Sequence, residues 1–188
     1  MMTYAMQQLS HQTDLNYLRR SRADLLFAAI AALSLGLCIY LIDRQPETAY
    51  LISNGLFLND NVRPVFGVMG NYLPTFLHVY AFILLSAAVF AQSHRQVLII
   101  CLSWLIIEII FELAQINIIA QSVAIHIPDW FSVIPVVNNT ANYFLMGTFD
   151  ILDIISIIAG TLIAYMTISL SSYLRSKPFI CGAENSKH

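Results

Sequence analysis

The sequence predicts an all-α membrane protein, a bundle of four transmembrane helices with interfacial or re-entrant segments in two extracytoplasmic loops. Of the 188 residues, 58% are hydrophobic and only 11% are charged, which is less than half the roughly 25% charge of an average soluble domain. The apolar residues gather in four long blocks, and about 20 apolar residues suffice to cross a hydrocarbon core roughly 30 Å thick. A net charge of −2 creates no basic surface, so we expect no nucleic acid partner.

The four blocks define a membrane domain over residues 25–170, flanked by a cytoplasmic N-terminal tail (1–24) and a cytoplasmic C-terminal tail (171–188). The expected spans are 25–42, 73–91, 97–119 and 149–170. Two connections, 43–72 and 120–148, are longer and contain apolar stretches too short to cross. These stretches predict the interfacial or re-entrant segments.

Small residues mark the faces on which helices are expected to meet. Ala28, Ala32 and Gly36 recur every four residues in the first span, and Gly160 and Ala164 do the same in the fourth. Small side chains at this spacing allow two helix backbones to approach closely in a membrane. We therefore expect another helix against each of these two faces.

The basic residues predict the orientation of the spans. With both termini in the cytoplasm, seven basic residues lie on the inner side and two on the outer side. The inner seven are Arg19, Arg20, Arg22, Arg95, Arg175, Lys177 and Lys187, and the outer two are Arg44 and Arg63. Cytoplasmic loops carry an excess of lysine and arginine, so this arrangement is favoured over its inverse.

Ionisable and amide side chains interrupt the apolar spans, and they are our candidate ligand-binding residues. They are His78, Glu108, Glu112, Gln115, Asp150 and Asp153. A carboxylate at a helix centre costs roughly 2.5–3.5 kcal/mol on insertion scales. Such residues face the bundle interior and mark functional sites by default.

The third span carries three of these residues on one helical stripe, because Glu108, Glu112 and Gln115 stand at positions i, i+4 and i+7. The stripe is expected to face the interior of the bundle. Two carboxylates one turn apart repel each other in a low dielectric. We expect Glu108 to hold a proton at neutral pH unless a cation lies between the two groups.

A common depth is expected for the polar residues of different spans. The second and fourth spans descend from the outside and the third ascends, so His78, Asp150, Asp153 and Glu112 share the outer third of the membrane, with Glu108 one turn deeper. We expect Glu112, His78 and Asp153 to approach within hydrogen-bond or one-water reach. The sequence thus predicts a polar pocket that opens to the extracytoplasmic side.

Two alternatives to a ligand pocket arise from the same residues. The polar groups would in one case only form hydrogen bonds that hold the helices together, with neutral carboxyl groups and a neutral imidazole. A metal site is the other, but carboxylate-bridged metals in bundles use Glu-x-x-His pairs, and no histidine stands three residues after Glu108 or Glu112. We expect no metal, no haem and no other cofactor.

Three segments, in this order, resemble the VanZ-like membrane family, small proteins named after a glycopeptide-resistance accessory protein. Residues 73–80 (LPTFLHVY) are similar to its D-K-x-x-H-x-x-x-Y, 104–115 (WLIIEIIFELAQ) to its helix ending E-x-x-Q, and 148–165 (TFDILDIISIIAGTLIAY) to its R-x-F-D-x-x-D-x-x-x-N-x-x-G. The matching positions are His78, Glu112, Gln115, Asp150, Asp153 and Gly160.

The resemblance implies a membrane fold with a polar site in a bacterial inner (cytoplasmic) membrane. Pro74, Gly147 and Ile157 stand where the family has aspartate, arginine and asparagine, so this pocket is expected to be less basic and to offer fewer donors. A link to the bacterial envelope or to antibiotic resistance follows by analogy only.

Three functions remain open at the level of sequence. The first is a non-enzymatic protein whose outward-facing pocket binds a lipid headgroup, an envelope precursor or a similar polar ligand. The second is an accessory subunit of a membrane complex, in which the polar stripes serve helix–helix contacts and the small face of the first span meets a partner protein. The third is an intramembrane hydrolase with Glu108 and Glu112 as acid and base, although no serine or cysteine nucleophile is clearly placed beside His78.

Overall fold

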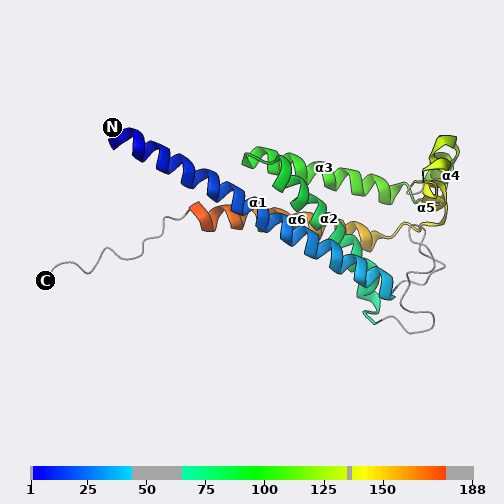
Figure 1. Ribbon diagram of the computed structural model, residues 1–188. Helices are drawn as coiled ribbons and strands as arrows, with labels where there is room; N and C mark the ends of the chain where they lie inside the picture. The colour runs from blue at the N-terminus through cyan, green and yellow to red at the C-terminus, as the bar shows by residue number, and fades with distance from the viewer. Residues whose placement is uncertain (1, 44–64, 135–136, 177–188) are drawn as a thin grey trace.

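The computed structural model describes residues 2–43, 65–134 and 137–176, and every regular element in these ranges is a helix (Figure 1). In chain order the elements are α1 (Met2–Asp43), α2 (Val68–Phe90), α3 (His94–Leu113), α4 (Asn117–His126), η3 (Asp129–Val133), α5 (Thr140–Met146) and α6 (Ile151–Ser176). The segment expected in the first long connection falls mostly on residues 44–64, and the C-terminal tail falls mostly on 177–188. Both lie outside the described residues.

Four of the helices are long and apolar enough to cross a membrane, which confirms the predicted fold class. The candidate spans are Arg22–Asp43, Val68–Phe90, His94–Leu113 and Ile151–Ser171. Large apolar side chains remain exposed along them, as on α3, where Ile99, Ile106 and Ile110 are 56–62% exposed. Such an apolar outer surface is suited to lipid and not to water.

The third span is shorter than expected. α3 ends at Leu113 instead of continuing to residue 119, and the chain bends before α4 begins at Asn117. The bend is a tight turn, in which Gln115 N donates to Glu112 O at 3.1 Å and Ile116 N donates to Leu113 O at 3.1 Å. Since the apolar run continues through the bend, hydropathy gives no sign of it.

The first helix runs through the predicted N-terminal tail. α1 begins at Met2 and continues without a break to Asp43. No glycine or proline precedes Gly36 in the sequence, so none of the residues that normally end a helix interrupts it. At its other end, Asp43 accepts hydrogen bonds from the backbone N–H groups of Val65 (2.7 Å) and Phe66 (3.0 Å).

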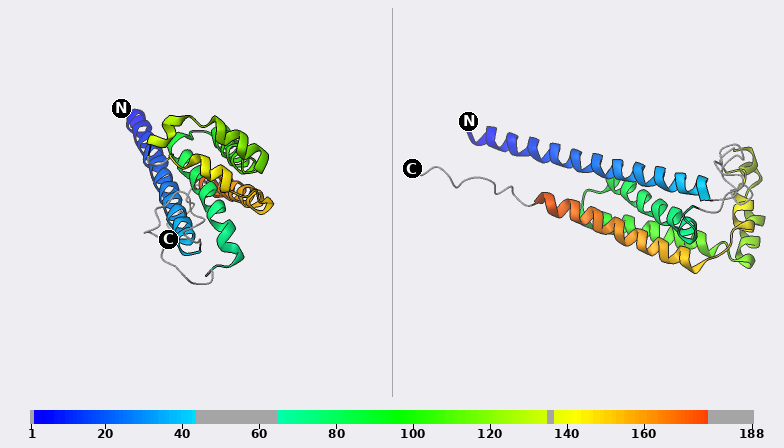
Figure 2. Two further views of the ribbon diagram at one scale, coloured as in Figure 1. Left: turned by 90° about the vertical axis from the view of Figure 1, so that its right-hand side faces the viewer. Right: turned by 90° about the horizontal axis from the view of Figure 1, so that it is seen from below.

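α2 lies at the centre of the bundle, where it packs against α1, α3 and α6, and α6 also packs against α3 (Figure 2). Its side chains supply much of the core: Val79, Ala81, Ile83 and Leu84 are fully buried. Pro74 lies inside this helix, because α2 begins at Val68. Pro74 has no N–H to donate to the carbonyl of Gly70, one turn earlier.

Small residues lie at both helix contacts, as predicted. A Cβ atom added to Gly36 of α1 would lie 3.4 Å from Leu77 Cβ of α2, and one added to Gly160 of α6 would lie 2.8 Å from the backbone oxygen of Phe76. Ala164 and Ala32 are buried in the same contacts. Ala28 is only half-buried. The small face of α1 is therefore occupied by α2 of the same chain.

The connection between α3 and α6 forms a helical cap at one end of the bundle. α4, η3 and α5 are too short to cross a membrane, and Figures 1 and 2 show α4 and α5 beside the ends of the spans, not among them. Trp130 of η3 is 59% exposed and meets the ring of Phe131 edge-on at 4.4 Å between ring centroids. The start of α1, the end of α6 and the α2–α3 turn lie at the opposite end (Figure 1).

Candidate functional site

Four of the six candidate residues, Glu112, Gln115, Asp150 and Asp153, lie at the capped end of the bundle, where α2 begins, α3 ends and α6 begins. Glu112 is the most buried of them, with 7% of its surface exposed. Its Oε1 accepts a hydrogen bond from the backbone N–H of Asp150 at 2.8 Å, and its Oε2 accepts one from Gln115 Nε2 at 3.5 Å. Glu112 thus joins the last turn of α3 to the residue before α6.

Asp150 acts as the N-cap of α6. Its Oδ1 accepts a hydrogen bond from the backbone N–H of Leu152 at 2.9 Å, and its Oδ2 accepts one from the Tyr72 hydroxyl of α2 at 2.9 Å. Aspartate is favoured at this position because it satisfies an unpaired helix N–H and its charge is stabilised by the helix dipole. The cap explains why α6 begins at Ile151.

Asp153 lies in the first turn of α6 and contacts α2 as well. Its Oδ1 accepts a hydrogen bond from the Thr75 hydroxyl at 2.8 Å. Tyr72 and Thr75 were missed by the sequence reasoning, although they stand three residues apart at the start of the second span and so share one helical face. Together with Asp150 and Asp153 they tie α2 to α6.

Tyr143 of α5 extends this network into the cap. Its hydroxyl accepts a hydrogen bond from Gln115 Nε2 at 3.3 Å. Burial, followed by the charges of Glu112 and Glu108, raises the pKa of Tyr143 to about 12, so the hydroxyl stays protonated at neutral pH. No spacing signal in the sequence could have identified this residue, because α5 lies in a loop that is far from α3 along the chain.

Gly147 fits closely against the same amide. A Cβ atom at this position would collide with Gln115 Oε1 and lie 2.8 Å from the carbonyl of Tyr143. The space that a larger residue would need at position 147 is therefore filled by the side chain of Gln115.

Glu108 and His78 lie next to the network but are not joined to it by a described hydrogen bond. Glu108 is half-buried and His78 is exposed. The imidazole of His78 meets the ring of Phe82 edge-on, with 4.3 Å between centroids. The expected approach of His78 to Glu112 and Asp153 stays a prediction.

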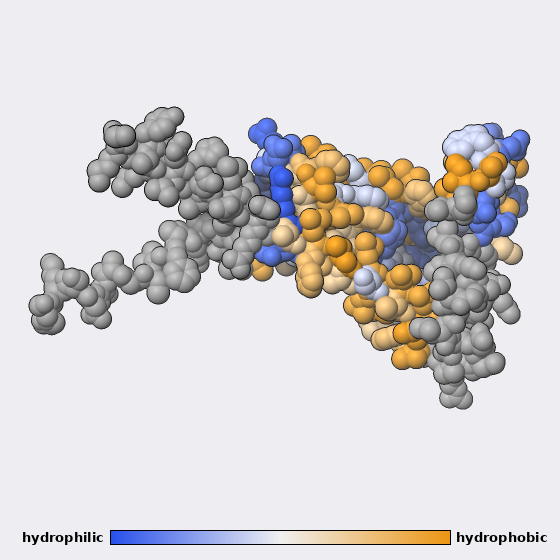
Figure 3. Space-filling view, viewed as in Figure 1, coloured by the Kyte–Doolittle hydropathy of each residue, from blue (hydrophilic) through white to orange (hydrophobic). Residues whose placement is uncertain are grey.

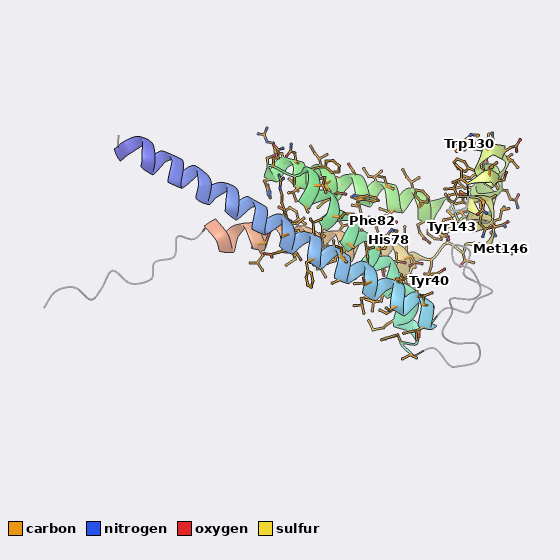
Figure 4. The ribbon with its side chains drawn as sticks, in the orientation of Figure 1. Tyr40, His78, Phe82, Trp130, Tyr143 and Met146 are labelled. Atoms are coloured by element: carbon orange, nitrogen blue, oxygen red, sulfur yellow. The ribbon has the colours of Figure 1, made fainter. Side chains whose placement is uncertain are left out.

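A hydrophilic recess is visible on the surface of the molecule in this region. Figure 3 shows it as a hollow of polar surface between two apolar areas, close to the capped end. In the same orientation, Figure 4 places His78 of α2, Tyr143 of α5 and Tyr40 of α1 around it. Tyr40 also influences the Tyr143 hydroxyl electrostatically, which places these two residues near each other.

Within the described ranges, no group of three or more His, Cys, Asp or Glu residues is placed to hold a metal ion. The donor set of the site is instead carboxylates, hydroxyls, one amide and one imidazole. Such a set exchanges hydrogen bonds with a polar ligand.

No family model, no curated protein and no solved structure matches this chain. The likeness to the VanZ-like family therefore rests on the three sequence segments alone.

Proposed function

We propose that this integral membrane protein is a non-enzymatic binding protein whose polar recess takes the headgroup of a membrane lipid, an envelope precursor or a similar polar ligand. One observation carries the proposal: a hydrophilic recess with apolar flanks lies beside a hydrogen-bonded network that joins α2, α3, α5 and α6. An amphipathic ligand fits such a surface, because its polar end and its apolar chains each meet a surface of matching polarity.

We infer the location of the protein from its sequence. The three VanZ-like segments favour a bacterial inner membrane, and the seven-to-two distribution of basic residues favours cytoplasmic termini. In this orientation the recess faces the extracytoplasmic half of the membrane. A role in the envelope or in antibiotic resistance remains an analogy from the family.

The network and the recess have separate roles in this proposal. Glu112 and Asp150 find their partners within the chain, so they act as positioning residues that hold the helix ends together. Glu108 and His78 lie outside these bonds, and in this proposal they are the residues that meet the ligand. An accessory subunit would need a face other than the small face of α1, which α2 already covers.

Native mass spectrometry tests the proposal. The purified chain is delipidated in detergent and offered a defined mixture of phosphatidylethanolamine, phosphatidylglycerol and cardiolipin. The wild type should retain a tightly bound lipid that the double variant His78→Leu/Glu108→Leu loses. Ser103→Leu is the matched control, because Ser103 is an exposed polar residue of α3 and the change also replaces a polar side chain by an apolar one.

The proposal fails if the double variant keeps the same tightly bound lipid as the wild type and the control. That outcome would refute a specific site in the recess. Such a result would mean that lipid binds over the whole apolar surface of the bundle.

A further inference from the structure

The register of α2 against α3 is set by an aromatic contact and a hydrogen bond. Phe82 of α2 stacks on Trp104 of α3, with 4.9 Å between ring centroids and 7° between ring planes. Trp104 Nε1 also donates a hydrogen bond to Ser86 Oγ at 2.9 Å. The two helices run antiparallel, since only three residues separate the end of α2 from the start of α3.

This register places His78 and Glu108 at one level of the bundle, whereas Glu108 was expected one turn deeper than His78. His78 stands one turn before Phe82, and Glu108 stands one turn after Trp104. At about 1.5 Å per residue, both steps move about 6 Å toward the capped end. The two ionisable side chains therefore occupy the same layer of α2 and α3, and Figure 4 places His78 beside the recess.

Within the described residues, neither of these side chains forms a hydrogen bond. Both belong to helices that are apolar enough to cross a membrane. A polar group left without a partner in hydrocarbon costs several kcal/mol. A molecule with polar atoms of its own, bound between Glu108 and His78, would satisfy both.

The charges around the recess indicate the sign of that molecule. Glu108 and Glu112 of α3 and Asp153 of α6 all act electrostatically on the Tyr143 hydroxyl, so they lie close together. The described basic side chains, Arg22 and Arg95, lie near the start of the α1 span and the start of α3, at the other end of the bundle. Among the described side chains, a cation complements this distribution.

We propose that the occupant is a membrane lipid whose headgroup carries a primary ammonium group, bound between Glu108 and His78. The inference rests on the proposed function and deepens it by naming the ligand class. A primary ammonium has three N–H donors, which match the Glu108 carboxylate, the acceptor nitrogen of a neutral imidazole and the oxygen of Tyr143. The flanks of the recess are apolar, which fits a lipid with acyl chains better than a free amine in water.

The test compares lipids with identical acyl chains and different headgroups. Dissociation constants are measured for phosphatidylethanolamine, phosphatidylcholine and phosphatidylglycerol on the delipidated protein. One charge-assisted hydrogen bond corresponds to about tenfold or more in affinity, so phosphatidylethanolamine should bind at least about tenfold more tightly than the other two. Glu108→Gln should remove this preference without weakening the binding of phosphatidylglycerol, and Glu108→Asp should restore part of it.

The outcomes separate this inference from the proposed function. Suppose that the recess binds one lipid tightly and yet shows no preference for a primary ammonium, or that it prefers phosphatidylglycerol. Either result would overturn the inference and leave the proposed function standing. Loss of specific lipid binding altogether would overturn both. Displacement of the lipid by ethanolamine at equal concentration would show that the site takes a free amine and would refute the lipid as occupant. Because the preference is measured on the wild type, the test holds even if Glu108→Gln fails to fold.

Discussion

At the scale of single residues, Glu112 and Glu108 lie one turn apart on α3 in different surroundings. Glu112 is buried and accepts the backbone N–H of Asp150 at 2.8 Å. Glu108 is half-buried and faces the layer of His78. The first residue positions the start of α6, and the second is the residue that the proposed function assigns to the ligand. Stability and binding should therefore respond to different substitutions.

Glu112→Ala should destabilise the protein more than Glu108→Ala. Removing the Glu112 carboxylate leaves the N–H of Asp150 without its acceptor, and a buried unsatisfied donor costs about 1–3 kcal/mol. Glu108→Ala removes no described hydrogen bond and serves as the control. The measurement is unfolding in mixed micelles with rising SDS, followed by tryptophan fluorescence. Equal losses of unfolding free energy would contradict the positioning role of Glu112.

Tyr143 should ionise well above the range of an ordinary tyrosine. Its pKa is raised from 10.0 to about 12 by burial and by the neighbouring carboxylates. The folded state therefore keeps a proton that the unfolded chain loses between these two values, so stability should fall as the pH rises through this window. The measurement is a pH titration followed by tyrosinate absorbance, carried out on the wild type and on Tyr143→Phe. The difference between the two curves is the titration of Tyr143 alone. A difference that titrates near 10 would show that Tyr143 is exposed to water.

The candidate residues could be predicted from spacing, but their division into network and recess could not. The spacing placed Glu108 and Glu112 correctly on α3, but Gln115, predicted on the same helical stripe, lies in the turn after α3 ends at Leu113. Whether each finds a partner depends on Asp150 and Tyr143, which reach α3 only through the packing of α6 and the cap. Local spacing carries no information about those long-range contacts.

At the scale of helices, α2 and α6 approach each other closely at Gly160. Alanine at this position would place its Cβ 2.8 Å from the backbone oxygen of Phe76, which cannot move like the end of a side chain. Gly160→Ala should therefore cost about 1–3 kcal/mol of unfolding free energy. Gly36→Ala is the matched control, since its Cβ would lie 3.4 Å from Leu77 Cβ. Equal effects of the two substitutions in the SDS titration would contradict the close α2–α6 contact.

Capping residues mark two of the observed helix starts. Ser93 and Gln96 form a capping box at the start of α3, and Asp150 caps α6. The end of α3 at Leu113 carries no such signal, because isoleucines continue on both sides of the bend. The sequence therefore predicted that the third span exists but placed its end too late.

At the scale of the whole molecule, the structure places Ser93 and Ser132 at opposite ends of the bundle. Ser93 precedes α3 and Ser132 lies in η3 of the cap. Single cysteines at these two positions, in a background without Cys38, Cys101 and Cys181, should be reached from opposite sides of the membrane. In intact cells, an impermeant thiol reagent should label Ser132→Cys, whereas Ser93→Cys should require permeabilised cells. Labelling of both in intact cells would contradict four spans, and the reverse pattern would invert the orientation.

The four-span architecture followed from composition because each span must present about 20 apolar residues to lipid. The arrangement of the spans did not follow, since apolar composition is similar on all four helices. Tyr72, Thr75 and Tyr143 complete the site only because α2 lies at the centre and α5 folds over the end of α3. The recess is thus a property of the packed bundle and not of any one segment.

The central claim is that the recess beside His78 and Glu108 holds the headgroup of a membrane lipid. Its most direct test is an experimental structure of the protein crystallised from a lipid phase that contains phosphatidylethanolamine. Ordered headgroup density between His78 and Glu108, with the acyl chains running along the apolar flanks, is the predicted result. The claim would be contradicted if lipid density lay elsewhere on the bundle and the recess held only water. A recess closed by a direct contact between His78 and Glu108 would contradict it as well.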